Sequence, residues 1–583
     1  MAKRWRIHPH EPERIAALER AVGVSAVVAQ LLICRGLCDP QRARQFLDCK
    51  LSDLHDPEQL PGCSLAAEKI HEAIRRGRRI VVYGDYDVDG LAGTALLCRC
   101  LKLLGGDVGY YLPNRIDESY GLHCEAIRRL AAEKAELMVT VDCGIASVPQ
   151  ARTARECGLE LIITDHHEPG ATLPEAEAIV HPRVPGSQYP FPWLSGSGVA
   201  LKLGWAVCQK ASGARRVAPA MKGFLLQAVG LAALGTVADV VPLVDENRVL
   251  VRHGLVSLKR SPTPGLSALM KVAGLDAKSS LDAEDIAFSL APRLNAAGRL
   301  GQAPLAAELL LTDRPERAQE LAPYIDQLNV DRQSLERSIH LTAAKLAREE
   351  FDPDRDAALV LAQRGWHPGV LGIVAGRLAE KYHRPVVLIA WDRLGVKPGV
   401  GSGRSVPGFN LHAALEACRE HLVGHGGHAA AAGLSIEEGK LQQFRREFCE
   451  YAARTISPED RQAELAIDAE SSLSLLTLQV VQQIERMAPF GQGNPRPLLC
   501  AQGVSVVESP QTIGSTGRHL AMKVEQHGVV LRAFAFGGAE WADDLAAAGG
   551  PLDIAFRPVV NTFRGRRSVE LQLLDWQPGS APA

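Results

Sequence analysis

Acidic and histidine residues follow three apolar runs in the first half of the sequence. The runs 80–83, 137–141 and 161–164 are rich in β-branched residues, as buried strands are. The residues that come directly after them are Asp85, Asp87 and Asp89, then Asp142, and then Asp165, His166 and His167. Because ligands bind outside the carboxyl ends of the strands in an open parallel sheet, we expect these side chains to converge in one crevice.

So many carboxylates in one place require cations. Each negative charge raises the pKa of its neighbours unless a positive charge neutralises it. Oxygen ligands with one or two imidazoles suit Mg²⁺ or Mn²⁺. Two such ions about 3.5–4 Å apart can activate a water and stabilise the leaving oxygen in phosphoryl hydrolysis. The pattern therefore predicts a centre of two metal ions that cleaves phosphoesters.

Each of these residues also has a structural explanation when taken alone. The run from Asp85 could begin an EF-hand calcium loop, but its twelfth position is Leu96, where such a loop ends in glutamate. Asp142 could cap a helix as readily as bind a metal. An isolated pair such as His166 and His167 is more often one surface and one core histidine. Asp239, which follows an apolar stretch, adds a further acid, and the grouping favours a ligand set.

The elements around these residues predict an α/β fold. From residue 78, apolar runs alternate with helical segments of about a dozen residues, which is typical of βαβ units and a parallel sheet. Residues 313–350 are rich in charge and alanine and predict a long connecting helix, after which a second α/β pattern begins. Five short strands near the end of the chain predict a barrel, an OB-fold: 503–507, 520–524, 529–536, 553–560 and 568–574.

We therefore expect five parts. They are an N-terminal helical entry segment 1–76, a catalytic domain 77–312, a connecting helix 313–352, a smaller α/β domain 353–460 and a nucleic-acid-binding barrel 461–583. A chain of 583 residues is too long for one hydrophobic core, so several domains are expected.

Composition narrows the class of protein. The formal net charge of -2 gives no general affinity for polyanions, so any basic groove must be local. The thirteen cysteines show no metal or disulfide spacing, which favours reduced thiols in the cytoplasm. The most apolar segments, 25–34 and 229–238, fall short of the roughly 20 residues that a membrane span needs. We expect no membrane association and no exported leader.

The predicted barrel carries residues suited to single-stranded nucleic acid. Arg564, Arg566 and Arg567 surround Gly565 at a predicted hairpin tip. Five aromatic residues could stack on bases, although most aromatics of a small barrel belong to its core: Phe534, Phe536, Phe556, Phe563 and Trp576.

The acidic motifs resemble those of the DHH phosphoesterase superfamily. Residues 85–90, 141–144, 165–167 and 235–239 are similar to its four motifs in order and spacing. The resemblance implies metal ligation by Asp85, Asp87, Asp89, Asp142, His166 and Asp239, with Asp142 as the bridge. It also implies that His167 lies beside the scissile phosphate, where Asp142, His167 and the supporting Asp165 form the catalytic set.

A glycine-rich stretch extends this resemblance. Residues 424–433 could place free amides at a helix start, although tight packing explains glycine and alanine equally well. G-G-H-x-x-A-A-G is nevertheless a hallmark of the DHH-associated domain, and residues 401–405 match the serine and arginine that this domain places near the substrate. The residues implied to contact phosphate or DNA are Arg115, Arg293, Arg299, Ser402, Arg404, His425, Gly426, Gly427 and His428.

The resemblance covers nearly the whole chain and is strongest to the exonucleases of the superfamily that act on single strands. It extends from 31–36 to 489–495. It implies a monomer that hydrolyses single-stranded DNA from the 5′ end to mononucleotides, with single-strand binding protein and a RecQ-type helicase as partners. Two alternatives are a phosphodiesterase of short oligonucleotides or cyclic dinucleotides and an inactive DNA-binding scaffold. The barrel argues against the first, and the intact acids argue against the second.

Overall fold

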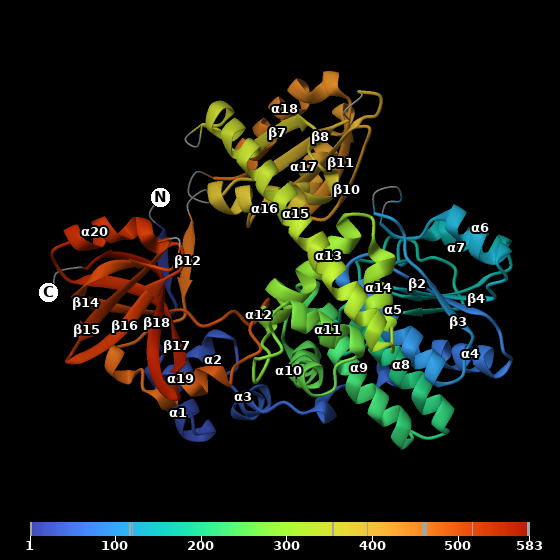
Figure 1. Ribbon diagram of the computed structural model, residues 1–583, viewed down its shortest axis with the longest axis horizontal. Coiled ribbons are helices and arrows are strands. Elements are labelled where there is room, and N and C mark those ends of the chain that lie inside the picture. The colour runs from blue at the N-terminus through green and yellow to red at the C-terminus, as the bar shows by residue number, and fades with distance from the viewer. Residues whose placement is uncertain are drawn as a thin grey trace. The chain divides into compact units, whose positions relative to one another are not determined.

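The computed structural model describes residues 3–579, except 116, 117, 119, 353, 354, 393, 394, 458–462 and 516. The chain forms two compact units, whose elements are labelled in Figure 1. The first unit combines Met1–Asp53, Pro242–Arg248 and Ala463–Ala583. The second combines Leu54–Val241 and Val249–Gln462.

The second unit begins with a fully parallel sheet whose strand order is β3-β2-β4-β5-β6. Its strands are β2 (Ile80–Gly84), β3 (Val108–Tyr111), β4 (Leu137–Val141), β5 (Glu160–Thr164) and β6 (Ala178–Val180). The central strands β2 and β4 are buried along their whole length, as their apolar composition predicts. The predicted parallel sheet is confirmed, although β3, which is half-exposed and contains glycine, was not predicted.

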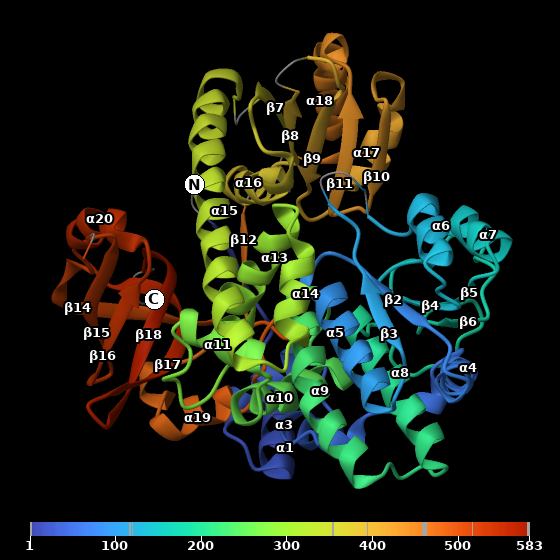
Figure 2. The same ribbon diagram turned by 45° about the vertical axis from the view of Figure 1, so that its right-hand side comes forward.

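Helices cover both faces of this sheet (Figure 2). Helices α6 and α7 pack their apolar residues against one face, and α5 and α8 contact the other. The helices of this layer are α4 (Cys63–Arg75), α5 (Val88–Leu103), α6 (Cys124–Ala132), α7 (Val148–Glu156) and α8 (Gly196–Ser212). This arrangement leaves the carboxyl edge of the strands open to hold a site.

A helical layer follows the sheet in the chain. It consists of α9 (Pro219–Ala238), α10 (Asp245–Arg260), α11 (Pro264–Val272), α12 (Ala283–Asp285), the π-helix η3 (Ile286–Leu290), α13 (Ala291–Arg299), α14 (Ala303–Leu311) and α15 (Pro315–Glu350). Helix α15 has 36 residues, which confirms the long connecting helix. It accommodates Pro323 near its start and packs against α11 and α13.

Helix α9 is longer than the apolar stretch 229–238 that forms its second half. Its 20 residues are long and apolar enough to cross a membrane by composition alone, which corrects the expectation that no segment reaches that length. However, 56% of its most apolar stretch is buried inside the protein, where it packs against α5 and α8. Its apolar composition is therefore that of a core helix.

The second α/β domain is built on a mixed sheet of order β10-β11-β9-β8-β7. Its strands are β7 (Leu359–Arg364), β8 (Val386–Trp391), β9 (Gly399–Arg404), β10 (Gly424–Gly427) and β11 (Ala431–Ile436). Helix α16 (Pro368–Tyr382) covers one face, and α17 (Leu411–Ala417) and α18 (Leu441–Thr455) cover the other. The glycine-rich stretch forms the β10–β11 hairpin, so of the two possibilities left open by the sequence it does not start a helix. Its backbone amides instead pair with neighbouring strands, because β11 is inserted beside β9.

The first unit contains the C-terminal barrel. Its strands are β13 (Ala469–Glu470), β14 (Leu499–Ile513), β15 (His519–Gln526), β16 (Val529–Ala535), β17 (Leu552–Phe563) and β18 (Arg566–Pro578), in the order β13-β14-β15-β16-β18-β17. Pairing of β14 with β17 closes the barrel. The five predicted strands are confirmed, and α20 (Ala542–Ala547) lies between β16 and β17 in the chain.

The N-terminal helices share a hydrophobic core with this barrel. They are α1 (Pro12–Val22), α2 (Ala26–Cys34) and α3 (Pro40–Leu47), and α19 (Leu478–Glu485) contributes to the same core. Strand β1 (Arg4–Ile7) pairs in parallel with β12 (Glu464–Ile467). The expected entry segment is thus divided, because residues 3–53 join the barrel whereas α4 packs against β6 and α8 of the other unit. Single-turn 3₁₀ helices are Leu51–Asp53, Pro57–Gln59, Arg419–His421, Glu438–Lys440, Leu473–Leu475 and Gly538–Trp541.

Candidate active site

Strand β2 and helix α5 place three carboxylates at the carboxyl edge of the parallel sheet. Asp85 follows β2 and is 2% exposed. Asp87 is the N-cap of α5, and its Oδ1 accepts hydrogen bonds from the amides of Asp89 at 2.9 Å and Gly90 at 3.2 Å. Asp89 lies in the first turn of α5 and is 1% exposed. One turn therefore supplies both a helix cap and candidate ligands.

The N-terminus of α8 holds Asp89 in place. The Asp89 carboxylate accepts hydrogen bonds from the Gly196 amide at 2.6 Å and the Ser197 amide at 2.9 Å. Free amides and the helix dipole both favour a negative charge at this position. Small residues permit the approach, because a Cβ atom on Gly235 would lie 2.3 Å from Asp89 Oδ1 and one on Gly196 would lie 2.6 Å from Asp142 Oδ1.

Asp142 follows β4 in a left-handed backbone conformation, with φ 64°. For a residue other than glycine this conformation costs on the order of 1–3 kcal/mol and persists where the surroundings fix it. The Asp142 amide donates to the Thr164 carbonyl at 3.1 Å, and the Tyr120 hydroxyl donates to the Asp142 carbonyl at 2.8 Å. Backbone strain at this point is consistent with a functional role for the side chain.

The candidate ligands form two groups that a third group connects. Ligand atoms within 4.8 Å of one another come from Asp85, Asp87 and Asp142 in one group and from Asp89, His166 and Asp239 in the other. Asp142 also groups with His166 and His167. His166 Nε2 lies 3.1 Å from Asp142 Oδ1 and 3.5 Å from Asp239 Oδ2. The geometry offers two adjacent cation positions with Asp142 between them.

Electrostatics at this edge call for positive charge. Burial and neighbouring carboxylates raise the pKa of Asp85 and Asp142 well above the ordinary value, and they raise the pKa of Asp239 to about 9. Burial also lowers the pKa of His166 to about 3, which keeps its imidazole neutral and able to bind a metal. Three buried atoms have no hydrogen-bond partner, namely Asp85 Oδ1, Asp142 Oδ1 and His166 Nε2. This set of oxygen and nitrogen donors fits Mg²⁺ or Mn²⁺.

Asp165 supports the two histidines. Its Oδ1 accepts the His166 amide at 2.7 Å and lies 2.7 Å from His167 Nδ1, and its Oδ2 accepts the Ile145 amide at 3.0 Å. Although burial opposes the charge on Asp165, the hydrogen bond from His167 and the positive charges nearby lower the pKa of this carboxyl. Burial likewise opposes protonation of His167, but the bond to Asp165 raises the His167 pKa to about 9. His167 is therefore a cation near neutral pH in the metal-free protein.

Three residues around this site were not predicted. Tyr120 Oη lies 2.9 Å from His167 Nδ1, and His181, which is fully buried after β6, donates from Nε2 to the His167 carbonyl at 2.8 Å. Ser197 holds Asp89 as described above. His181 had a sequence signal, because it directly follows the apolar strand β6. Ser195, which is the N-cap residue of α8, marks the helix start at which Ser197 lies.

A cavity of about 820 Å³ joins the carboxylates to the β9–β11 sheet. Its lining includes Asp85, Tyr86, Asp87, Arg115, Tyr120, His167, Ser402, Arg404, His425, Gly426, Gly427 and His428. The rings of His167 and His428 stack with their centroids 6.5 Å apart. The guanidinium of Arg115 lies over the Tyr86 ring, 4.9 Å from its centroid. Most residues predicted to contact phosphate therefore share one cavity with the carboxylates.

The predicted arginines differ in their surroundings. Burial lowers the pKa of Arg299 to about 9, and Arg115 and Arg404 contribute to the same effect. Arg404 donates to the Gly403 carbonyl at 2.7 Å, and Arg299 donates to the Gly369 carbonyl at 2.9 Å. Mutual repulsion of these cations favours an anion between them. Arg293 does not line the cavity, since it donates to Asp326 at 2.8 Å.

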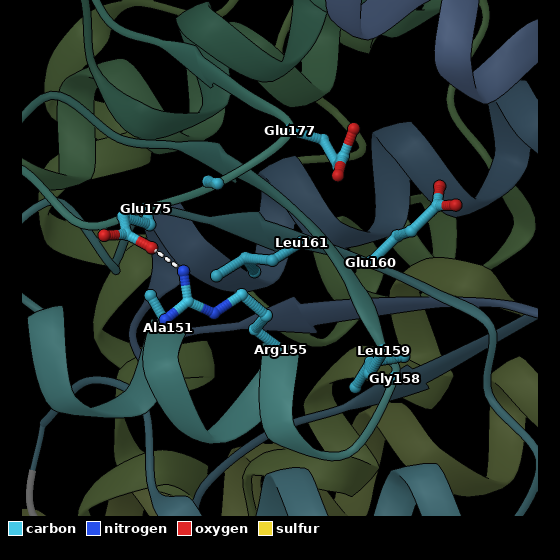
Figure 3. A pocket seen from close by; sticks show the side chains of 9 residues that line it. Ala151, Arg155, Gly158, Leu159, Glu160, Leu161, Glu175 and Glu177 are labelled. Atoms are coloured by element: carbon cyan, nitrogen blue, oxygen red, sulfur yellow. Dashed lines mark hydrogen bonds and ion pairs between the residues drawn. The ribbon is translucent and has the colours of Figure 1, made fainter.

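The cavity drawn in Figure 3 has the opposite character. It lies at the amino end of β5, of which Glu160 is the first residue, and its volume is about 290 Å³. Its acidic lining residues are Glu160, Glu175 and Glu177, and its Arg155 is paired with Glu175. A phosphodiester would be repelled there, so this cavity is not a candidate for the same substrate.

The barrel residues divide into core and surface. Phe556 is fully buried and Trp576 packs against the core, whereas Phe536 is 67% exposed and stands edge-on to Phe534. The side chain of Phe563 lies outside the described residues. The turn between β17 and β18 consists of Arg564 and Gly565, both with positive φ, which confirms the hairpin tip. Arg566 and Arg567 follow it and are exposed.

Fold and site together define a DHH phosphoesterase. Residues 79–235 match the family described as "DHH family, N-terminal domain", residues 356–454 match the "DHHA1 domain", and residues 467–575 match the "RecJ OB domain".

Full-length relatives make the assignment narrower. The single-stranded-DNA-specific exonuclease RecJ of Bacillus subtilis is 35% identical, over 98% of this chain and 70% of its own. RecJ of Escherichia coli is 37% identical, over 91% of this chain and 92% of its own. The crystal structure of Thermus thermophilus RecJ in complex with Mn²⁺ superposes with a TM-score of 0.83 at 34% identity, covering 99% of this chain and 80% of that one. The chain belongs to the RecJ family.

Proposed function

We propose that this chain is a metal-dependent exonuclease that hydrolyses single-stranded DNA from the 5′ end and releases mononucleotides in recombination and repair. The observation that carries the proposal is the convergence of the two ligand groups, with Asp142 between them, on a cavity lined by arginine. Relatives over nearly the whole chain are single-stranded-DNA-specific exonucleases. Structures of RecJ from Thermus thermophilus contain Mn²⁺ or Mg²⁺.

Two divalent cations are assigned to the carboxyl edge of the sheet. Asp85, Asp87, Asp89, Asp142, His166 and Asp239 would hold them. Bound there, such ions would lower the pKa of a water molecule and neutralise the charge that develops on the phosphate. The protein's own contribution is to fix the ligands: α8 amides hold Asp89, and Asp165 holds both histidines.

His167 and the arginines are assigned to the substrate. His167 faces the cavity from beside the ligands and would contact the scissile phosphate. Arg404 would bind the terminal phosphate, because a guanidinium can bond two of its oxygens at once. Arg115, Ser402 and the β10–β11 hairpin residues His425, Gly426, Gly427 and His428 line the same cavity. We assign Arg299 a supporting electrostatic role and assign Arg293 no contact.

We assign to the barrel the binding of the DNA that lies outside the active site. Phe534 and Phe536 offer exposed ring faces, and Arg564, Arg566 and Arg567 supply positive charge at the hairpin tip. Stacking on aromatic rings does not depend on sequence, which suits an enzyme that degrades any single strand. A duplex hides its base faces, so this surface favours single-stranded DNA.

We further propose that the protein works as a cytoplasmic monomer with single-strand binding protein and a RecQ-type helicase. Membership of the RecJ family supports these assignments. A helicase would supply the single strands on which such an enzyme acts.

One digestion experiment tests reaction, polarity, metal and strand choice together. Single strands labelled at the 5′ or the 3′ end, and a matched duplex, are incubated with the full chain in Mg²⁺, Mn²⁺ or EDTA. We expect the 5′ label to appear at once as a mononucleotide, the 3′ label to shorten progressively, and the duplex and EDTA samples to remain intact. Release of the 3′ label first, or digestion in EDTA, would contradict the proposal.

A further inference from the structure

The segment that follows Asp239 is built into the other unit of the protein. Asp239 ends α9 in the unit that carries the carboxylates, whereas Pro242–Arg248 belongs to the unit that contains the barrel. Only Val240 and Val241 connect the two. Three Cα–Cα steps separate Asp239 from Pro242 and span at most about 11 Å, so the position of Pro242 restricts where the Asp239 backbone can lie.

Residues 489–495 of the first unit form a loop that contacts this segment. The Leu243 amide donates to the Gln492 carbonyl at 2.7 Å. The glycines of the loop lie directly against the segment, since a Cβ atom on Gly491 would lie 2.7 Å from Leu243 Cδ1 and one on Gly493 would lie 3.0 Å from Pro242 Cβ. Asn494 stiffens the loop, because its Nδ2 donates to the Met487 and Pro489 carbonyls at 2.9 and 2.8 Å.

Two arginines add hydrogen bonds that hold the loop and the segment in place. Arg248, which is 2% exposed, donates to the carbonyls of Phe46, Met487 and Ala488 at 2.8, 2.8 and 2.9 Å. Arg35 donates to Asn494 Oδ1 at 2.8 Å and to the Pro495 carbonyl at 2.6 Å. The stretches 31–36 and 489–495, which mark the two ends of the family resemblance, therefore both contribute to these contacts.

The connecting residues show that both ends are held. Val240 has φ 60° although it is β-branched and 66% exposed. A β-branched residue adopts this conformation only where the structure on either side imposes it. Because most of the Val240 side chain is exposed, the chain before and after it is the main source of this constraint.

We infer that the loop 489–495 is a positioning element for the metal centre: by holding Pro242–Val244 it fixes Asp239, and it thereby couples the barrel unit to metal binding. This inference rests on the proposed assignment of Asp239 as a ligand. Groups that orient a ligand usually change metal affinity roughly 10–100-fold when they are lost. The loop itself touches neither metal nor substrate.

Equilibrium binding of Mn²⁺, followed by electron paramagnetic resonance without DNA, tests the inference on the full chain. The first variant inserts two glycines between Val240 and Val241, which lengthens the connection and leaves every contact of the loop intact. The second is Gly493→Ala. Both should weaken Mn²⁺ binding roughly tenfold or more, and hydrolysis should recover at saturating Mn²⁺.

Matched controls separate coupling from general damage. Gly528 has φ 80° in the β15–β16 turn and nothing within 4 Å of its Cβ position, so Gly528→Ala brings the same backbone strain without a neighbour. Two glycines inserted beside Gly528 match the other variant. Both controls should bind Mn²⁺ like the wild type. Circular dichroism confirms folding, and the insertion variant still decides the question should Gly493→Ala fail to fold.

Asp239→Asn separates the positioning role of the loop from the assignment of Asp239 as a metal ligand. If this variant binds Mn²⁺ weakly while the insertion variant binds it normally, the coupling is wrong and the ligand assignment stands. If Asp239→Asn itself binds Mn²⁺ normally, the ligand assignment is wrong and the coupling falls with it.

Discussion

At the scale of single residues, Asp142 is the carboxylate that the proposed two-metal centre shares between both cation positions. It contributes to the ligand group of Asp85 and Asp87 and also lies 3.1 Å from His166 Nε2. Its raised pKa shows that a charge at this position is unfavourable in the metal-free protein. Metal binding removes that penalty, so the same residue should destabilise the empty site and stabilise the occupied one.

Asp142→Asn should therefore have opposite effects on stability in the two states. Asparagine tolerates the left-handed backbone and removes only the charge. In EDTA the variant should melt at the same temperature as the wild type or higher, whereas Mn²⁺ should stabilise it less. Hydrolysis should fall by roughly a thousandfold, because a metal's charge stabilisation is worth several kcal/mol. Calorimetry and the nuclease assay measure both effects, and full activity in the variant would refute the assignment.

The ion pair of His167 with Asp165 predicts a pH dependence of stability in EDTA. Folding raises the His167 pKa from its ordinary value of 6.5 to about 9. The stabilisation is fully present below the ordinary pKa and is lost as the pH rises through about 9. A shift of this size corresponds to on the order of 3 kcal/mol. The free-energy difference between wild type and His167→Gln should be larger by that order at about pH 6 than at about pH 10.

Chemical denaturation at the two pH values measures this difference. A difference that is independent of pH would show that folding leaves the His167 pKa unchanged, and the ion pair with Asp165 would be wrong.

The sequence predicted the carboxylates better than it predicted the residues that contact and orient the site. Asp85, Asp142 and His166 stand directly after apolar runs, and the topology of a parallel sheet brings such positions together. His181 follows the same rule, because it directly follows the short strand β6. Tyr120 does not, because its contact with His167 depends on how a loop folds over the sheet edge. Arg293 pairs with Asp326, a contact that the sequence did not predict, because a long arginine side chain can reach partners on several elements.

At the scale of elements, the glycine-rich stretch is the segment whose structure the sequence left open. Glycine and alanine carry little hydrophobic periodicity, so residues 424–433 fit a helix start and a hairpin equally well. The pairing of β11 with β9, which lies about 30 residues earlier in the chain, decides between them. Strands with alternating patterns, such as β15 and β16, were predictable from the sequence alone.

The exposed ring of Phe536, which directly follows β16, should bind bases. Phe536 is 67% exposed, so Phe536→Ala should leave stability almost unchanged and weaken binding to an oligothymidylate by about tenfold, since stacking on one base is worth about 1–3 kcal/mol. Val530→Ala is the matched control, because Val530 is 51% exposed on β16 and has no ring. Fluorescence anisotropy in EDTA measures both affinities. Equal losses for the two variants would exclude stacking at Phe536.

At the scale of the whole molecule, the division into units did not follow the order of the chain. The N-terminal helices share a core with a barrel more than 400 residues later, and Pro242–Arg248 joins the same unit. Local patterns cannot report such pairings, because each segment is merely apolar on one side. A deletion of the barrel unit would also remove the contacts that hold Pro242–Arg248. Such a deletion would change DNA binding and metal binding together, whereas surface substitutions on the barrel test DNA binding alone.

The central claim is that distant carboxylates jointly hold two cations, and a crystal structure of the full chain with Mn²⁺ tests it most directly. We predict two anomalous difference peaks about 3.5–4 Å apart. One should contact Asp85 and Asp87, the other should contact His166 and Asp239, and Asp142 should contact both. A single peak, or two peaks that share no carboxylate, would contradict the account.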